Sequence, residues 1–205
     1  MPGPVLVTLS TDLDPLMTTP LAQLAPVSGT DWPWLQSAVQ MARITCRDWP
    51  SGLGNRGDWT TAPRVATRKP APAPASIPPS RAFALRTMHR WGEAGRADDV
   101  AAVVSELLAN ALRHALPQAG DDVRPWPIRL GLLHAGAYVV CAVADPGAGI
   151  PVLREPDQLE ESGRGLVVVA SLSDQWGYCP APERQLRGGE QGKVVWAAFA
   201  ATTLF

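Results

Sequence analysis

Proline is distributed unevenly along this chain of 205 residues. Thirteen of the 21 prolines lie in the first 80 residues, and residues 63–80 read PRVATRKPAPAPASIPPS. Proline fixes φ and removes a backbone donor, so this stretch favours extended chain over packed structure. We therefore predict a Pro/Ala-rich linker at 63–79 between an N-terminal region, residues 1–62, and a regular domain, residues 80–205.

The N-terminal region has one segment of helical periodicity, from Trp34 to Trp49, where Leu35, Val39, Ala42 and Cys46 recur at threes and fours. One short helix cannot bury a core alone. Two expectations stay open: the region is partly disordered, or it docks its helix and its tryptophans on the main domain or on a partner. The tryptophans concerned are Trp32, Trp34, Trp49 and Trp59.

The composition is that of a soluble globular protein, with 18% charged residues and a net charge of −1. This balance favours neither nucleic acid nor membrane as a partner. No apolar run approaches the roughly 20 residues that span a bilayer, and we expect a cytoplasmic protein. Cys46, Cys141 and Cys179 have no C-x-x-C spacing, so free thiols are expected rather than a disulfide framework or a zinc site.

Residues 80–205 alternate between helical and strand patterns. Helices are predicted first and antiparallel strands later, which indicates an α+β fold: a two-layer sandwich of a mixed, mostly antiparallel sheet with helices on one face. The predicted helices are 81–93, 99–115 and 165–172, and the predicted strands are 128–132 (half-buried), 138–144, 175–179 and 194–200.

The helix at 99–115 carries a polar column beside its apolar face. Glu106, Asn110 and His114 are spaced four apart and therefore stack on one side of the helix. An ordinary amphipathic helix with solvated polar residues has the same pattern. The apolar face consists of Val100, Val103, Val104, Leu107, Leu108, Ala111 and Leu112.

Two glycine-rich segments follow. Asp145 leaves an apolar strand into the sequence DPGAGI, where glycines allow close approach of a ligand to the backbone. Residues 162–166, SGRGL, open a helix whose free amides suit a phosphate. Taken alone, a D-x-G-x-G sequence is most often a plain turn, and a segment such as SGRGL is more often a flexible loop capped by glycine. The sequence has no G-x-x-x-x-G-K-[ST] P-loop and no G-x-G-x-x-G fingerprint after a first strand.

Five segments occur along the chain in the order ELLANALRHA, DPGAGIP, GRGL, DQWG and GKVVW. Together they resemble the ATPase domain shared by gyrase B subunits, sensor histidine kinases and anti-sigma-factor serine kinases. This is the GHKL superfamily, which has the Bergerat ATP-binding fold. The chain is most similar to the small anti-sigma type of actinobacteria. The resemblance covers residues 80–205 and implies ATP and Mg²⁺ as cofactors.

The resemblance also implies roles for single residues. Asn110 would coordinate the Mg²⁺ that bridges the phosphates, since an amide oxygen is a suitable hard ligand. Glu106 would be the catalytic general base that takes a proton from the attacking hydroxyl. Asp145 would accept a hydrogen bond from the adenine amino group.

The glycines of the two loops would shape the nucleotide site. Gly147 and Gly149 would border the adenine pocket, and Gly163, Arg164 and Gly165 would form the hinge and the phosphate-contacting edge of a short ATP lid. Val194 stands where relatives of this type commonly have Thr, whose hydroxyl supports the adenine-binding aspartate. Its absence predicts ATP binding weaker by on the order of 1 kcal/mol.

As a function, the resemblance implies a transcription regulator that binds a sigma factor, phosphorylates an anti-anti-sigma protein as a serine/threonine kinase, and forms homodimers. The alternative is a partner-switch module that binds ATP without transferring phosphate. A sensor histidine kinase is disfavoured, because His89 lacks the acidic and proline neighbours usual after a phosphoacceptor histidine.

Overall fold

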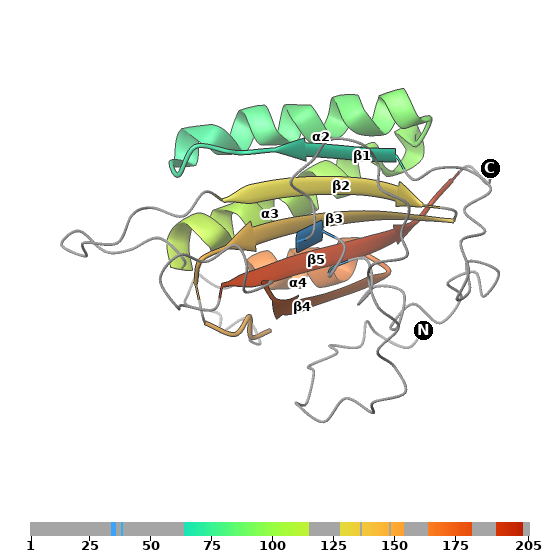
Figure 1. Ribbon diagram of the computed structural model, residues 1–205. Helices are drawn as coiled ribbons and strands as arrows, with labels where there is room; N and C mark the ends of the chain where they lie inside the picture. Colours follow the sequence, from blue (N-terminus) through green and yellow to red (C-terminus); the bar gives the residue numbers. More distant parts are fainter. Residues whose placement is uncertain are drawn as a thin grey trace.

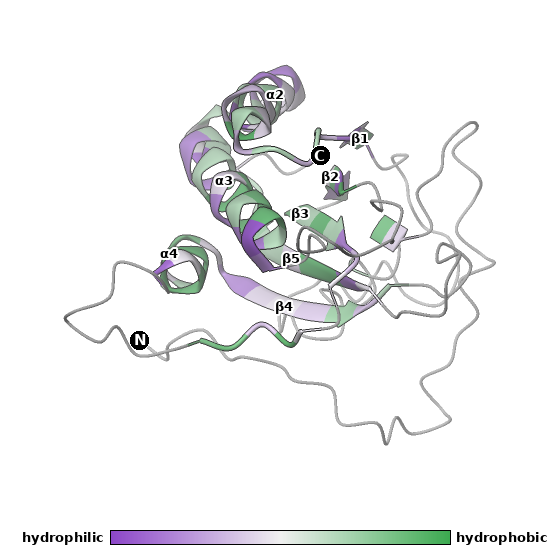
Figure 2. Cartoon of the chain, turned by 90° about the vertical axis from the view of Figure 1, so that its left-hand side faces the viewer, coloured by the Kyte–Doolittle hydropathy of each residue, from purple (hydrophilic) through white to green (hydrophobic). Residues whose placement is uncertain are grey.

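The computed structural model describes residues 34, 35, 38, 64–114, 128–135, 137–147, 149–153, 164–181 and 192–202. Its strands form one antiparallel sheet in the order β1-β2-β3-β5-β4, and α2, α3 and α4 cover one face of it (Figures 1 and 2). The predicted α+β fold is confirmed. The strands are β1 (Arg64–Arg68), β2 (Arg129–Ala135), β3 (Tyr138–Asp145), β4 (Gln175–Pro180) and β5 (Lys193–Ala200), and the helices are α2 (Ile77–Trp91), α3 (Ala97–His114), α4 (Gly165–Leu172) and the short 3-10 turns Pro74–Ser76 and Ala94–Arg96.

The prediction of a linker at 63–79 is wrong where β1 lies. Residues 64–68, RVATR, contain no proline and pair antiparallel with β2, from Arg64 opposite His134 to Arg68 opposite Leu130. Among the described strands, β1 lies at one edge of the sheet and pairs with β2 alone. Apart from Pro63, the prolines of this stretch come after β1, where they take no place in the described sheet and their missing amides are not needed.

α2 begins at Ile77, four residues before the predicted start at 81. Pro78 and Pro79 fall in its first turn, where backbone amides have no partner within the helix, so proline is accepted there. The helix ends at Gly92, whose φ of 85° lies in the left-handed region and whose amide donates to the carbonyls of Met88 and His89. The proline cluster therefore starts a helix instead of extending a linker.

α3 confirms the predicted amphipathic helix. Asp98 and Asp99 lie in its first turn, where the positive end of the helix dipole favours carboxylates. Its apolar face is buried against the sheet and α2, with Leu112 only partly buried at the margin. This packing sets the direction in which the polar column of α3 points.

The second face of the sheet is also buried. Trp34, Leu35 and Ala38, the described residues of the predicted N-terminal helix, have helical backbone and pack against side chains of this face (blue in Figure 1). The prediction of a half-buried β2 is wrong for this reason: Gly131 and Leu133, which point to the second face, are buried as well. For the described residues, docking is the arrangement observed.

Candidate functional site

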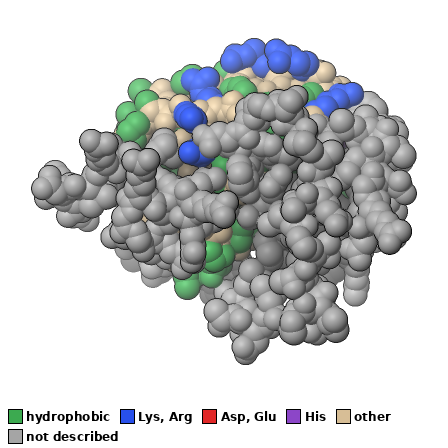
Figure 3. Space-filling view, in the orientation of Figure 1, with side chains coloured by type: hydrophobic (Ala, Val, Ile, Leu, Met, Phe, Trp, Pro, Cys, Tyr) green, Lys and Arg blue, Asp and Glu red, His purple; other side chains and the backbone are tan. Residues whose placement is uncertain are grey.

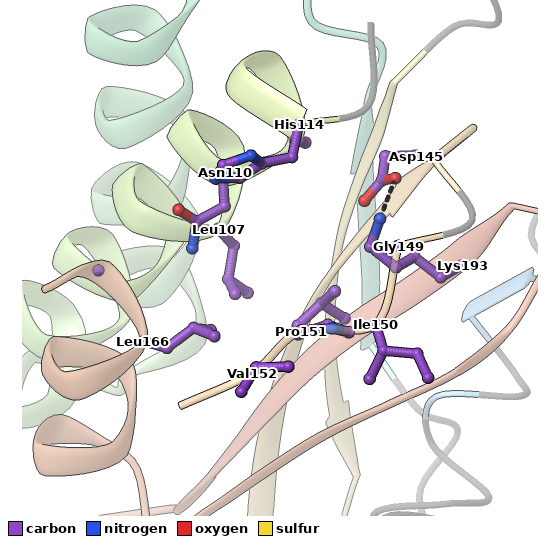
Figure 4. A pocket seen from close by; sticks show the side chains of 13 residues that line it. Leu107, Asn110, His114, Asp145, Gly149, Ile150, Pro151, Val152, Leu166 and Lys193 are labelled. Carbon is purple, nitrogen blue, oxygen red and sulfur yellow. Dashed lines mark hydrogen bonds and ion pairs between the residues drawn. The ribbon is translucent and has the colours of Figure 1, made fainter. Parts of the chain in front are cut away.

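A cavity of about 410 Å³ lies between α3, α4, the segment 149–153 and the adjoining ends of β3 and β5 (Figure 4). One wall is helical and carries amide and imidazole groups, and the other carries a carboxylate and an ammonium group. The lining residues are Leu107, Asn110, Ala111, His114, Asp145, Gly149, Ile150, Pro151, Val152, Gly165, Leu166, Lys193 and Val195. A mostly apolar cavity with a few convergent polar groups is typical of a small-molecule site.

The polar column of α3 is divided between this cavity and its border. Asn110 and His114 line the cavity, whereas Glu106, one turn earlier, is half-buried and does not line it. The Oδ1 atom of Asn110 accepts one long hydrogen bond, 3.5 Å from Nη1 of Arg113. That contact is weak, so the amide oxygen of Asn110 remains available to a ligand.

The first residue of α4 lies against this column. A Cβ atom added to Gly165 would lie 2.9 Å from Oε2 of Glu106 and 3.2 Å from Oδ1 of Asn110. Both distances are shorter than ordinary van der Waals contact, so the glycine is needed for this close approach. The structure thus brings Glu106, Asn110 and Gly165 together.

Asp145 ends β3 with its side chain 2% exposed. Its Oδ1 atom accepts hydrogen bonds from the amide of Gly147, at 2.9 Å, and from Nζ of Lys193, at 2.8 Å. Burial raises the pKa of the Asp145 carboxyl, and the nearby Lys193 ammonium, the Gly147 amide and His114 act in the opposite direction. A buried carboxylate with a fixed partner is a typical ligand-recognition group.

The expected role of position 194 is wrong. In the β3–β5 register, Asp145 faces Lys193, whereas Val194 faces Ala144 and its side chain packs in the second face of the sheet. Val194 therefore does not approach Asp145, and a hydroxyl missing there cannot weaken a contact with it. The neighbour of Asp145 is Lys193, which we had not predicted as a site residue.

Strand alternation was a usable signal for Lys193. Side chains two apart share a face, so Lys193 and Val195 lie together on the cavity side. The missing fact was the register between β3 and β5, which decides whether residue 193 or 194 stands beside Asp145.

The remaining predicted residues separate into three groups. Gly147 donates its amide to Asp145, and Gly149 lines the cavity, where an added Cβ would meet nothing within 4 Å. Arg164 is exposed directly before α4 and does not line the cavity. Gly163 lies outside the described residues.

Within the described ranges, no three His, Cys, Asp or Glu side chains gather to hold a metal ion, and no helix is long and apolar enough to cross a membrane. Cys141 and Cys179 are free and buried, and burial raises the pKa of both thiols to about 12. Cys46 lies outside the described residues.

Comparison with known proteins agrees with the fold. The family model described as the histidine kinase-like ATPase domain matches residues 71–199, well over half of the chain. No curated protein matches the chain. The superfamily prediction is confirmed, and the anti-sigma type stays a prediction. The chain belongs to the family of histidine kinase-like ATPase domains.

Proposed function

We propose that the protein is an ATP-binding regulator of the anti-sigma type, and that it phosphorylates a serine of an anti-anti-sigma protein. The observation that carries this proposal is the meeting of Gly165 with Glu106 and Asn110 beside a cavity that has Asp145 on its opposite wall. The base of a nucleotide needs a hydrogen-bond acceptor and apolar contacts, whereas its phosphates need a metal ligand and amide donors. The strand wall and the helical wall of the cavity offer these groups separately.

The adenine base would lie at the strand wall. Asp145 has one oxygen, Oδ2, without a hydrogen-bond partner among the described residues, and a carboxylate accepts from an exocyclic amino group. Apolar side chains of Ile150 and Val195 border the same space and suit the faces of a purine ring. Asp145 would then determine which base binds, and the apolar lining would provide contact area for the base.

The phosphates would lie at the helical wall. The amide oxygen of Asn110 fits Mg²⁺, an ion that keeps waters and phosphate oxygens as its other ligands and needs few protein groups. When bound, Mg²⁺ neutralises charge on the phosphates. The amides at the start of α4, with the exposed Arg164 beside them, favour a phosphate group through the helix dipole.

Glu106 is the residue we assign as general base for the attacking hydroxyl. It is half-buried beside Gly165, within one helical turn of the Mg²⁺ ligand Asn110. A carboxylate in this place can accept the proton of a serine hydroxyl that enters from outside the cavity. Transfer of the γ-phosphoryl group would then end on the partner serine.

A charged surface suits a protein partner. Residues 64–92 contain six Lys and Arg and no Asp or Glu, and these cations gather over β1 and α2 along the top of the molecule (Figure 3). Complementary charge speeds association and orients partners. We propose that this surface meets an acidic face of the sigma factor or of the antagonist.

A second candidate function is a non-catalytic partner switch, in which ATP shapes a binding surface. It is favoured by one observation: Glu106 does not line the cavity. Incubation with labelled ATP, Mg²⁺ and a candidate antagonist separates the two functions. Label on the antagonist that is lost in Glu106→Gln supports the kinase, and ATP binding without any transfer supports the switch.

The site itself is tested by titrating the wild type and Asn110→Ala with ATP and Mg²⁺. We expect the variant to bind ATP more weakly by a factor of about ten and to lose the effect of Mg²⁺ on affinity. Equal affinity and equal metal dependence in both proteins would contradict the site assignment.

A further inference from the structure

We propose that Lys193 is a positioning residue: it keeps Asp145 as a carboxylate with one oxygen directed to the ligand, and so makes the cavity select a base that donates a hydrogen bond. This inference rests on the proposed binding of ATP in the cavity. It adds to that proposal the residue that decides which nucleobase is accepted.

One carboxylate oxygen of Asp145, Oδ1, is bonded within the protein, and the other, Oδ2, is left for a ligand. Nζ of Lys193 lies 2.8 Å from Oδ1 of Asp145 and 2.8 Å from the carbonyl oxygen of Gly147. The amide of Gly147 donates to the same Oδ1. Oδ1 is therefore occupied by two donors, while Oδ2 has no partner among the described residues. In Figure 4 the ion pair with Lys193 uses one oxygen of Asp145, and both residues border the cavity.

The same contacts fix the turn that follows β3. An ammonium group has three N–H donors, and Lys193 uses two of them, one on the Asp145 side chain and one on the Gly147 backbone. Because Lys193 stands opposite Asp145 in the β3–β5 register, its side chain starts from the sheet itself and not from a loop. The orientation of Asp145 is thus held by two elements of the sheet.

Charge gives Lys193 a second effect. The Asp145 side chain is 2% exposed and that of Lys193 12%, so the carboxylate depends on this ammonium for compensation. Burial raises the pKa of Asp145, and Lys193 is the first of the groups that oppose the shift. The other titratable group acting on Asp145 is His114 of α3. Without Lys193, protonation of Asp145 would extend toward neutral pH.

The protonation state of Asp145 determines which nucleobase the cavity prefers. A carboxylate only accepts, so it matches the amino group at position 6 of adenine. A protonated carboxyl can donate, so it matches the carbonyl oxygen that hypoxanthine has at the same position. ATP and ITP therefore report on whether Asp145 is ionised, and they share the same ribose and triphosphate.

The test is titration of the full chain with ATP and with ITP from pH 6 to pH 9, for the wild type and Lys193→Met. At pH 7 we expect Lys193→Met to bind ATP about tenfold more weakly and the ratio of ATP to ITP affinity to fall about tenfold. The affinity of the variant for ATP rises with pH as Asp145 loses its proton, and the midpoint of this rise lies at a higher pH than in the wild type.

Three controls separate positioning from general damage. Lys193→Arg keeps the positive charge and should restore the ratio and the pH midpoint of the wild type. Asp145→Asn combined with Lys193→Met has no carboxyl at position 145, so the part of the pH dependence that comes from Asp145 should disappear. The series is repeated with His114→Gln, which removes the other side chain that lowers the pKa of Asp145 through its charge. Thermal unfolding of each protein reports on its fold.

The outcomes distinguish the two proposals. If Lys193→Met binds ATP with the base ratio and the pH midpoint of the wild type, Lys193 has no positioning role, and ATP binding stands. If high pH does not restore ATP binding to a folded Lys193→Met, the inference is likewise overturned. If the wild type binds neither nucleotide, the proposed function fails, and the inference fails with it.

Discussion

The two faces of the sheet are both buried, but they are covered by different parts of the chain. The helix face packs under α2, α3 and α4, which follow one another along residues 77–172. The second face packs under Trp34, Leu35 and Ala38, which precede β1 by about 30 residues. Because β2, β3 and β5 contribute side chains to both faces, the site on the helix face rests on strands that the N-terminal segment also holds.

The two faces also differ in how closely their parts approach. On the second face, a Cβ added to Gly131 would lie 2.8 Å from Cη2 of Trp34, and one added to Gly177 would lie 2.9 Å from Cζ2 of Trp196. Small residues there make room for the large indole rings. On the helix face, the close approach is at Gly165, beside a polar column. Glycine serves packing on one face and the site on the other.

The largest expected effect is that of Trp34→Ala. Trp34 is 1% exposed, and its removal from the second face should lower the free energy of unfolding by about 3–5 kcal/mol. Chemical denaturation measures the change. The control is Ile150→Ala, because Ile150 is 62% exposed and should cost less than about 0.5 kcal/mol. If Trp34→Ala lowers the free energy of unfolding as little as the control does, the contact of Trp34 with the sheet does not stabilise the fold.

Gly131→Ala tests the same contact from the side of β2. The new Cβ would overlap Trp34 and Leu35, so we expect a loss of about 1–3 kcal/mol in the free energy of unfolding. The double variant with Trp34→Ala should lose less than the sum of the two single losses, since removing the Trp34 ring also removes its overlap with the new Cβ. Strict additivity in this double-mutant cycle would show that Gly131 and Trp34 do not interact.

The helix face contains a buried polar pair, which predicts a dependence of stability on pH. Nε2 of His134 lies 3.6 Å from Oε1 of Glu93, and its ring stacks on Trp91. Burial lowers the pKa of His134 below 6.5, more than the Glu93 carboxylate raises it. The imidazole is therefore neutral in the folded protein, and the contact with Glu93 is not an ion pair at neutral pH.

The sign follows from proton binding. Below about pH 6.5 the unfolded chain takes up a proton at His134 that the folded protein does not hold, so stability decreases as pH falls. Between pH 7 and 5.5 we expect a loss of no more than about 1 kcal/mol, measured by denaturant unfolding. His134→Gln should remove this part of the slope. An unchanged slope in the variant would assign the pH dependence to other groups.

The smallest effect is expected for Gly165→Ala, and it should appear in binding rather than in stability. The new Cβ would displace the ends of the Glu106 and Asn110 side chains, which can turn away at little cost to the fold. ATP affinity should fall a few-fold, by less than about 1 kcal/mol, with an unchanged free energy of unfolding. Gly149→Ala is the matched comparison, because its Cβ would meet nothing within 4 Å. A larger loss of ATP affinity in Gly149→Ala than in Gly165→Ala would indicate that the ligand binds closer to segment 149–153 than to Gly165.

Much of the helix face could be predicted from sequence periodicity. The apolar face and the polar column of α3, the carboxylate at the end of β3 and the helix that opens at Gly165 all follow from local patterns. The start of α2 and the strand β1 could not, because the density of proline in residues 63–80 concealed a proline-free strand and a helix whose first turn accepts proline.

The sequence by itself determined the order of the elements that follow β1 and most residue types of the site, since spacings of two and of four residues are properties of a strand and of a helix alone. Tertiary structure alone decided two matters. The register of β5 against β3 places Lys193, and not Val194, beside Asp145. The docking of Trp34 and Leu35 buries the second face of β2. Both depend on contacts between residues distant in sequence, and local periodicity carries no information about which partner or which register is chosen.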